Sequence, residues 1–200
     1  MKQAALIAAC GLALVLGGCF DEEEKVLDIV LTGETSADFD QNETTSSWTE
    51  AAVIDVASQI RDVLEENGYT QDDLKSAHLT SVSYGVTAFF YQPHDWSISG
   101  SIRVSADGGA SQPVLSYASQ SVQAALDKKI SPSLQTAGVD VVNGALDDFV
   151  QGANPVLGFV IQNLGTTPTP SVDDPMVFTW RAWLAIQVVI DQEVKVFDPF

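Results

Sequence analysis

The stretch 176-MVFTWRAWLAIQVVIDQEVKVF-197 has the strongest alternation of apolar and polar residues in the chain. Every second residue from Met176 onward is apolar for eight positions, whereas the residues between them include Arg181 and Gln187. A period of two is that of a β-strand with one face in the core and the other toward water. As one strand it would extend ~70 Å at about 3.3 Å per residue, so we expect it to bend, bulge or project beyond its sheet.

Four other segments are rich in β-branched and aromatic residues, as strands are. They predict strands over residues 25–32, 78–91, 96–105 and 156–164. Gln92-Pro93-His94-Asp95 joins the second and third at hairpin length. The polar residues 34–46 predict a loop.

Three segments have helical periodicity. The first begins at Ser47, because Ser47 and Glu50 have the spacing of a capping box, and ends at Asn67-Gly68. Its predicted inward side includes Val53, Ala57, Ile60 and Leu64. The other two predicted helices cover residues 116–130 and 137–151.

The resulting order, β-α-β-β-α-α-β-β, predicts an α+β fold. We expect an antiparallel β-sheet with three helices packed on one face and the long amphipathic C-terminal strand in the sheet. The half-polar back of that strand predicts that the other face of the sheet is wet.

The N-terminus has the pattern of an export signal. Lys2 is the positive residue, and an apolar core runs from Ala4 to Leu16. This core is shorter than the ~20 residues that a membrane-spanning helix needs. Gly17 and Gly18 then precede Cys19.

Leu16-Gly17-Gly18-Cys19 resembles the lipobox of bacterial lipoproteins. The resemblance implies that residues 1–18 are a cleaved signal peptide and that Cys19 carries a diacylglycerol as the new N-terminus. Residues 19–25 are then a lipidated acidic tether, and residues 26–200 are a single α+β domain. An ordinary secretory leader, cut nearby, is the alternative.

This reading leaves no cysteine for a disulfide, because Cys10 lies in the leader. Without Lys2, the chain has 8 basic residues against 27 acidic ones, a net charge of −19. Such a charge repels nucleic acid and anionic headgroups, so we expect no nucleic-acid partner, and the lipid on Cys19 must supply the membrane affinity. Salt adaptation and binding of a cationic partner or Ca²⁺ both remain open.

Candidate chemistry is sparse, and we expect no enzyme, no catalytic residues and no cofactor beyond the lipid. The His94-Asp95 pair could orient an imidazole, but no nucleophile motif accompanies it, and no zinc pattern occurs. Asp38, Asp40 and Asn42 alternate as oxygen ligands do in calcium loops and are a weak Ca²⁺ candidate, since the rest of the EF-hand pattern is absent.

The aromatic residues of the predicted strands are expected in the core. Trp183 differs, because it falls on the polar-leaning face with Arg181, and the two are a possible binding surface. Its exposure would favour a partner or ligand surface.

The expected function is that of a membrane-anchored envelope lipoprotein acting as a non-catalytic binding or structural component. One alternative is a carrier of an apolar, lipid-like ligand held between sheet and helices, and a weaker one is an envelope hydrolase using a carboxylate pair. In enterobacterial lipoproteins, an Asp directly after the lipidated cysteine signals retention in the inner membrane. This chain has Phe20 at that position, so the resemblance implies the outer membrane. Periplasmic and surface display both stay open.

Overall fold

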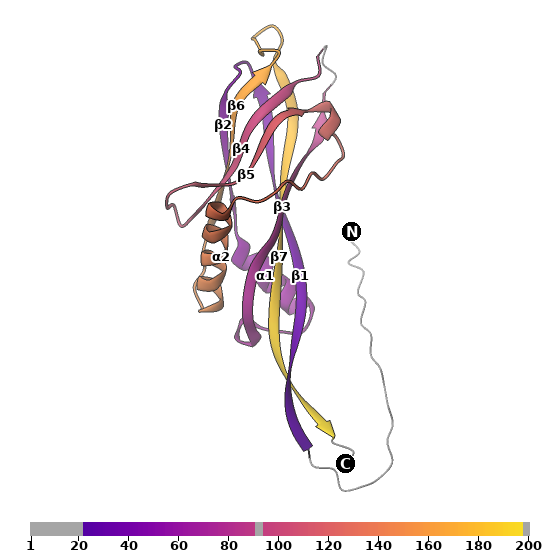
Figure 1. The fold of residues 1–200 in the computed structure, drawn as a ribbon, viewed down its shortest axis with the longest axis vertical. Coiled ribbons are helices and arrows are strands. Elements are labelled where there is room, and N and C mark those ends of the chain that lie inside the picture. The colour runs from indigo at the N-terminus through magenta and orange to yellow at the C-terminus, as the bar shows by residue number, and fades with distance from the viewer. Residues whose placement is uncertain (1–21, 91–93, 198–200) are drawn as a thin grey trace. The chain divides into compact units, whose positions relative to one another are not determined.

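The computed structural model describes residues 22–90 and 94–197 (Figure 1). The predicted signal peptide and Cys19 lie outside them. Residues 28–192 form one compact unit, and the described residues outside it belong to a second, smaller unit. In the smaller unit, the described residues are the extended ends of β1 (Glu22–Glu43) and β7 (Met176–Phe197).

Two antiparallel sheets hold the strands that the structure describes. One has the order β1-β7-β3, with β3 at Leu74–Phe89. The other has the order β2-β6-β4-β5. Its strands are β2 (Trp48–Ile54), β4 (Ser97–Ala106), β5 (Gln112–Ser121) and β6 (Leu157–Thr167).

Two α-helices are present in the described part of the chain, α1 (Val56–Glu66) and α2 (Thr136–Val150). Short 3₁₀ turns lie at Gln71–Asp73 and Gln123–Ala125. The Asp55 side chain caps α1 by accepting a hydrogen bond from the Ser58 amide (2.9 Å).

The length of β7 is explained by the two different layers that cover its inner face. Near its start, Trp180 stacks on Tyr84 of β3 (4.9 Å between ring centroids) and meets Tyr117 of β5 at 5.5 Å, so here the two sheets face each other. Further along, Ile186 and Val188 line a small cleft with Ile60 of α1. One strand thus spans a sheet-on-sheet layer and a sheet-on-helix layer.

The predicted inner face of β7 is confirmed. All eight alternating residues are buried: Met176, Phe178, Trp180, Ala182, Leu184, Ile186, Val188 and Ile190. They belong to one hydrophobic cluster with side chains of both sheets and both helices. Register shifts at three points of the β3–β7 pair supply the irregularity expected of so long a strand.

The free edge of β3 is covered in two ways. Residues 126–130 pair with it, since Ile130 and Tyr84 exchange backbone hydrogen bonds of 2.8 and 2.9 Å. Nearer the start of β3, Asn143 of α2 accepts a hydrogen bond from the Leu79 amide (2.8 Å). Covering an edge in this way blocks pairing with another chain.

The predicted single sheet with three helices on one face is wrong, because the described chain is mostly strand, with two sheets and two helices. A mixture of helices and sheet is the part of that expectation that holds. The predicted helix 116–130 is instead β5 followed by a 3₁₀ turn. Pairing with β4 supplies hydrogen bonds that outweigh its helical periodicity.

The helix predicted from Ser47 begins at Val56, because Trp48–Ile54 pairs along its whole length with β6. Val53 is therefore 71% exposed rather than inward, whereas Ala57, Ile60 and Leu64 are buried as predicted. The loop predicted over residues 34–46 is also wrong up to Glu43, where β1 ends.

The hairpin predicted across residues 92–95 joins strands of different sheets, so β3 and β4 do not pair. Residues 91–93 lie outside the described part. The helix predicted over residues 137–151 agrees with α2 to within one residue at each end.

Candidate functional site

The outer face of the three-stranded sheet carries a half-buried tryptophan among paired charges. We call Glu34, Asp38, Lys129, Arg181 and Trp183 the Trp183 surface. Asp38 and Glu34 lie on exposed, even-numbered positions of β1, and Arg181 and Trp183 lie on the odd-numbered face of β7. Lys129 comes from the segment that pairs with the edge of β3.

Two ion pairs fix the position of the cations. The Arg181 guanidinium donates Nε and Nη2 hydrogen bonds to the two oxygens of Asp38, both at 2.5 Å, in a bidentate arrangement. Lys129 Nζ bonds to the carboxylate of Glu34. The hydrogen bond from Arg181 holds the pKa of Asp38 below its usual range, and the same bond raises the pKa of Arg181.

Both cations also lie over the indole of Trp183. Lys129 Nζ is 5.6 Å and Arg181 Cζ is 6.0 Å from its ring centre, within the range of cation–π attraction. The ring and the four charged groups therefore stabilise one another across β1, β7 and residues 126–130. The five residues of this surface are aromatic at their centre and carry no net charge, on a strongly acidic chain.

Gly85 makes this arrangement sterically possible. A Cβ built on Gly85 would lie 1.9 Å from the Lys128 carbonyl oxygen and 3.3 Å from the Trp183 ring. Glycine therefore lets residues 126–130 approach β3 closely enough for Lys129 to reach across the sheet.

Sequence reasoning found Trp183 and Arg181 but missed Lys129, Glu34 and Gly85. Lys128-Lys129 is the one pair of adjacent basic residues in an acidic chain, and that was the available signal. Its position over Trp183 depends on the pairing of residues 126–130 with β3, which no local pattern encodes.

The weak Ca²⁺ candidate lies on the same outer face. Asp38, Asp40 and Asn42 are exposed side chains of an extended strand rather than of a loop. Asp38 is bound to Arg181, and Asp40 accepts a hydrogen bond from the Thr179 hydroxyl (2.7 Å). Within the described ranges, no three His, Cys, Asp or Glu side chains are grouped as metal ligands.

The His94-Asp95 pair does not form a hydrogen-bonded couple. His94 Nε2 lies 3.1 Å from Asp174, whereas Asp95 accepts hydrogen bonds from the Ser121 hydroxyl (2.7 Å) and the Gln123 amide (3.1 Å). Each side chain thus has a separate partner.

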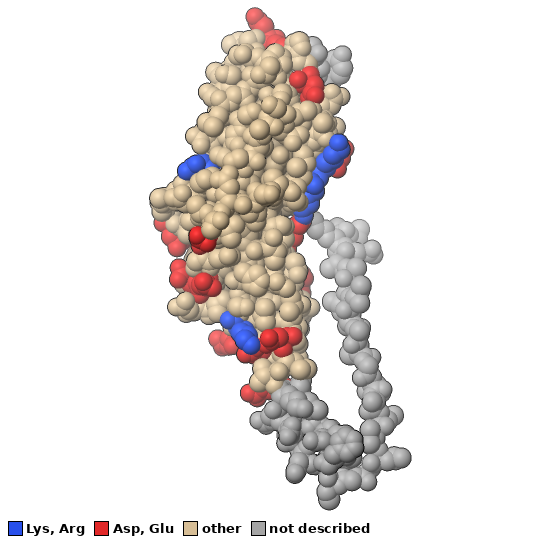
Figure 2. All heavy atoms as spheres, in the orientation of Figure 1, with Lys and Arg blue, Asp and Glu red and all other residues tan. Residues whose placement is uncertain are grey.

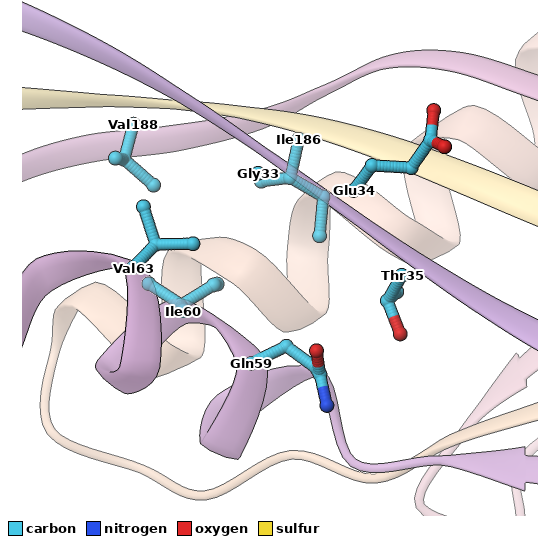
Figure 3. A pocket seen from close by; sticks show the side chains of 8 residues that line it. All are labelled: Gly33, Glu34, Thr35, Gln59, Ile60, Val63, Ile186 and Val188. Carbon is cyan, nitrogen blue, oxygen red and sulfur yellow. The ribbon is translucent and has the colours of Figure 1, made fainter. Parts of the chain in front are cut away.

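A small apolar cleft lies between β1, α1 and β7. Figure 3 shows the side chains of Ile60 and Val63 pointing toward Ile186 and Val188. Its volume is about 30 Å³, room for one or two water molecules and far below the roughly 300–1,000 Å³ of ligand pockets. A larger hollow of about 320 Å³ between α2 and the β4–β5 turn is wide open and bordered by Asp140 and Asp148.

The outer face of the four-stranded sheet contrasts with the Trp183 surface. On β4 its central positions carry Ser99, Ser101, Arg103 and Ser105. On β6 they carry Gly158, Val160 and Gln162. Arg103 donates a 2.6 Å hydrogen bond to the Ser111 carbonyl oxygen. Figure 2 shows broad uncharged areas over the part of the molecule that holds this sheet.

No described helix is both long and apolar enough to cross a membrane. Comparison with known proteins assigns no family, because no family model, no curated protein and no solved structure matches the chain.

Proposed function

We propose that this chain is a lipid-anchored bacterial envelope protein whose domain is a non-catalytic binding or structural component. The Leu16-Gly17-Gly18-Cys19 motif supports the anchor. The observation that carries the binding role is the Trp183 surface, where a half-buried indole lies under two cations that are themselves ion-paired.

Such a surface suits recognition because its side chains already contact one another in the unbound protein. Ion pairs and the aromatic ring hold each other in place, so little side-chain entropy is lost on binding. Tryptophan and arginine are also the side chains that contribute most to protein interfaces. The proposed partner is another envelope protein, and the outer membrane is the proposed location.

The carrier of an apolar ligand is a weaker proposal. The cleft between α1 and β7 is apolar, but its volume of about 30 Å³ would have to increase several-fold to hold an acyl chain.

The anchor is tested by Cys19→Ala. We expect the variant to be released from the membrane or mislocalised, while its domain keeps the wild-type circular dichroism spectrum. Mass spectrometry of the wild-type N-terminus should find an acylated cysteine. An unmodified wild-type N-terminus, or a Cys19→Ala variant that keeps the wild-type localisation, would refute the anchor.

The binding role is tested by photo-crosslinking in intact cells. A photoreactive residue at Ser36, on the exposed face of β1 between Glu34 and Asp38, should crosslink to one discrete protein, and Trp183→Ala should abolish the product. The same residue at Ala51, exposed on the other sheet, is the control. Equal products at both positions, or none at Ser36, would contradict the proposed surface.

A further inference from the structure

A group of polar side chains lies at the end of the core where β1 passes into β2. Gln41 follows the buried Phe39 on the inner face of β1, and Glu43 is the next residue on that side. Glu50 lies on the face of β2 that also carries Trp48, which is buried. The Nε2 atom of Gln41 donates a hydrogen bond to the carboxylate of Glu50, which joins the two sheets here.

The carboxylates of this group have no basic partner. Burial raises the pKa of Glu50, the hydrogen bond from Gln41 opposes that rise, and Asp40 and Glu43 add to it electrostatically. Among the described residues, the lysines and arginines that form ion pairs do so elsewhere: Lys75 with Asp28 and Asp191, Lys129 with Glu34, and Arg181 with Asp38. The negative charge around Glu50 is therefore not compensated by any described base.

Gln41 adds an independent observation. Its side chain is 2% exposed and its Nε2 atom faces Glu50, yet its Oε1 atom has no hydrogen-bond partner among the described residues. Native proteins leave few buried acceptors unpaired. A donor side chain would satisfy the oxygen, but only a cation would also compensate the neighbouring carboxylates.

We propose that Gln41, Glu43 and Glu50 bind a divalent cation, Ca²⁺ being the one that their oxygens suit. Ca²⁺ takes carboxylate and amide oxygens together with water, and a half-turn of the Gln41 amide would present its oxygen to the ion. Two carboxylates and one amide are a smaller set than that of an EF-hand. The expected affinity is therefore that of extracellular modules, about 10⁻⁴–10⁻³ M.

This site is distinct from the alternating oxygens of Asp38, Asp40 and Asn42. Those residues lie on the opposite side of the same strand, where Asp38 and Asp40 already have partners. Glu50 is only partly buried, so an ion could reach it from solvent. The proposed ion site includes neither Cys19 nor any residue of the Trp183 surface.

The test is thermal unfolding of the mature full-length protein in detergent, with CaCl₂ against NaCl of equal ionic strength. A Ca²⁺ concentration of about 10 mM is roughly ten times the largest Kd in the expected range. At that concentration the Tm should rise by roughly 3–6 °C. An unchanged Tm, with no heat of binding in calorimetry, would overturn the proposal.

Two variants locate the ion. Glu50→Gln should melt no lower than wild type in NaCl, because a partly buried charge is gone, but should lose the Ca²⁺-dependent shift. Gln41→Met keeps the side-chain length without the amide oxygen and should reduce the shift, which provides a second reading if Glu50→Gln does not fold. Asn42→Ser, on the outer side of the strand, should keep the full shift. A full shift in Glu50→Gln or Gln41→Met, or its loss in Asn42→Ser, would refute the site.

Discussion

The inner and outer faces of the three-stranded sheet use tryptophan in opposite ways. Trp180 and Trp183 lie three residues apart in β7 and so point to opposite faces. Trp180 is fully buried among Tyr84, Tyr117 and Phe178. Trp183 is half-buried and packs against Gly85 and two cations.

The difference lies in what holds each ring. The inner ring is held by area removed from water, an effect that is non-directional and is not screened by dissolved ions as charge interactions are. The outer ring is held by charges whose positions depend on two ion pairs, each about 36–45% exposed, so its environment responds to salt and pH. The inner face specifies the fold, and the outer face carries the surface that we propose as the binding site.

The largest expected effect is that of Trp180→Ala on the inner face. Removing a buried indole leaves a cavity between the two sheets and should lower the free energy of unfolding by about 3–5 kcal/mol. Urea denaturation followed by far-UV circular dichroism measures it. A loss below about 1 kcal/mol would mean that the two sheets do not depend on this contact.

Gly85→Ala tests the close approach of residues 126–130 to β3, on which the position of Lys129 over Trp183 depends. The new Cβ would lie 1.9 Å from the Lys128 carbonyl oxygen, so residues 126–130 must move away from β3, at a cost of about 1–3 kcal/mol. Faster amide exchange at Ile130 should accompany the loss. Gly165→Ala in β6, where a Cβ would meet nothing within 4 Å, is the matched control and should change stability little.

Trp183→Ala should have a smaller effect, about 1–2 kcal/mol, because the ring is only half-buried and its two cation–π contacts contribute about 0.5–1 kcal/mol each. Trp183→Phe keeps an aromatic ring and should retain much of the stability that Trp183→Ala loses. Urea denaturation of both variants gives the comparison, and a loss as large as that of Trp180→Ala would remove the distinction between the faces.

Asp38→Asn is expected to have the smallest effect, at most about 1 kcal/mol, because the ion pair with Arg181 is exposed. The pKa of Asp38 is lowered in the folded protein, so its contribution is full at neutral pH and is lost as pH falls below about 4 through the folded pKa. The stability difference from wild type should therefore vanish in acid and shrink in about 1 M salt. A difference that grows in acid would contradict the pairing.

Elements with a strong pattern were predictable, and those that depend on distant pairing were not. β7 begins and ends where its alternation does, and α2 follows its helical period. The inner face of β1 includes Gly33, Thr35 and Gln41, which are not hydrophobic, so no hydrophobic pattern predicts that they face inward. Pairing with β7 extends that strand through the predicted loop.

The candidate sites divide in the same way. Trp183 and Arg181 could be singled out because an aromatic and a cation share the polar side of an alternating strand. Lys129 could not, because it reaches them only after residues 126–130 pair with β3. Gln41 and Glu50 face each other only because β1 and β2 belong to different sheets that meet at one end.

The sequence by itself determined the two faces of β7, the helix α2, the acidic charge and the lipobox-like motif, because each is written in neighbouring residues. The tertiary structure alone decided that there are two sheets in the described chain, that Trp48–Ile54 and Gln112–Ser121 are strands, and which charges surround Trp183. Those outcomes depend on hydrogen bonds and contacts between residues far apart in the chain, whose energies outweigh local propensity.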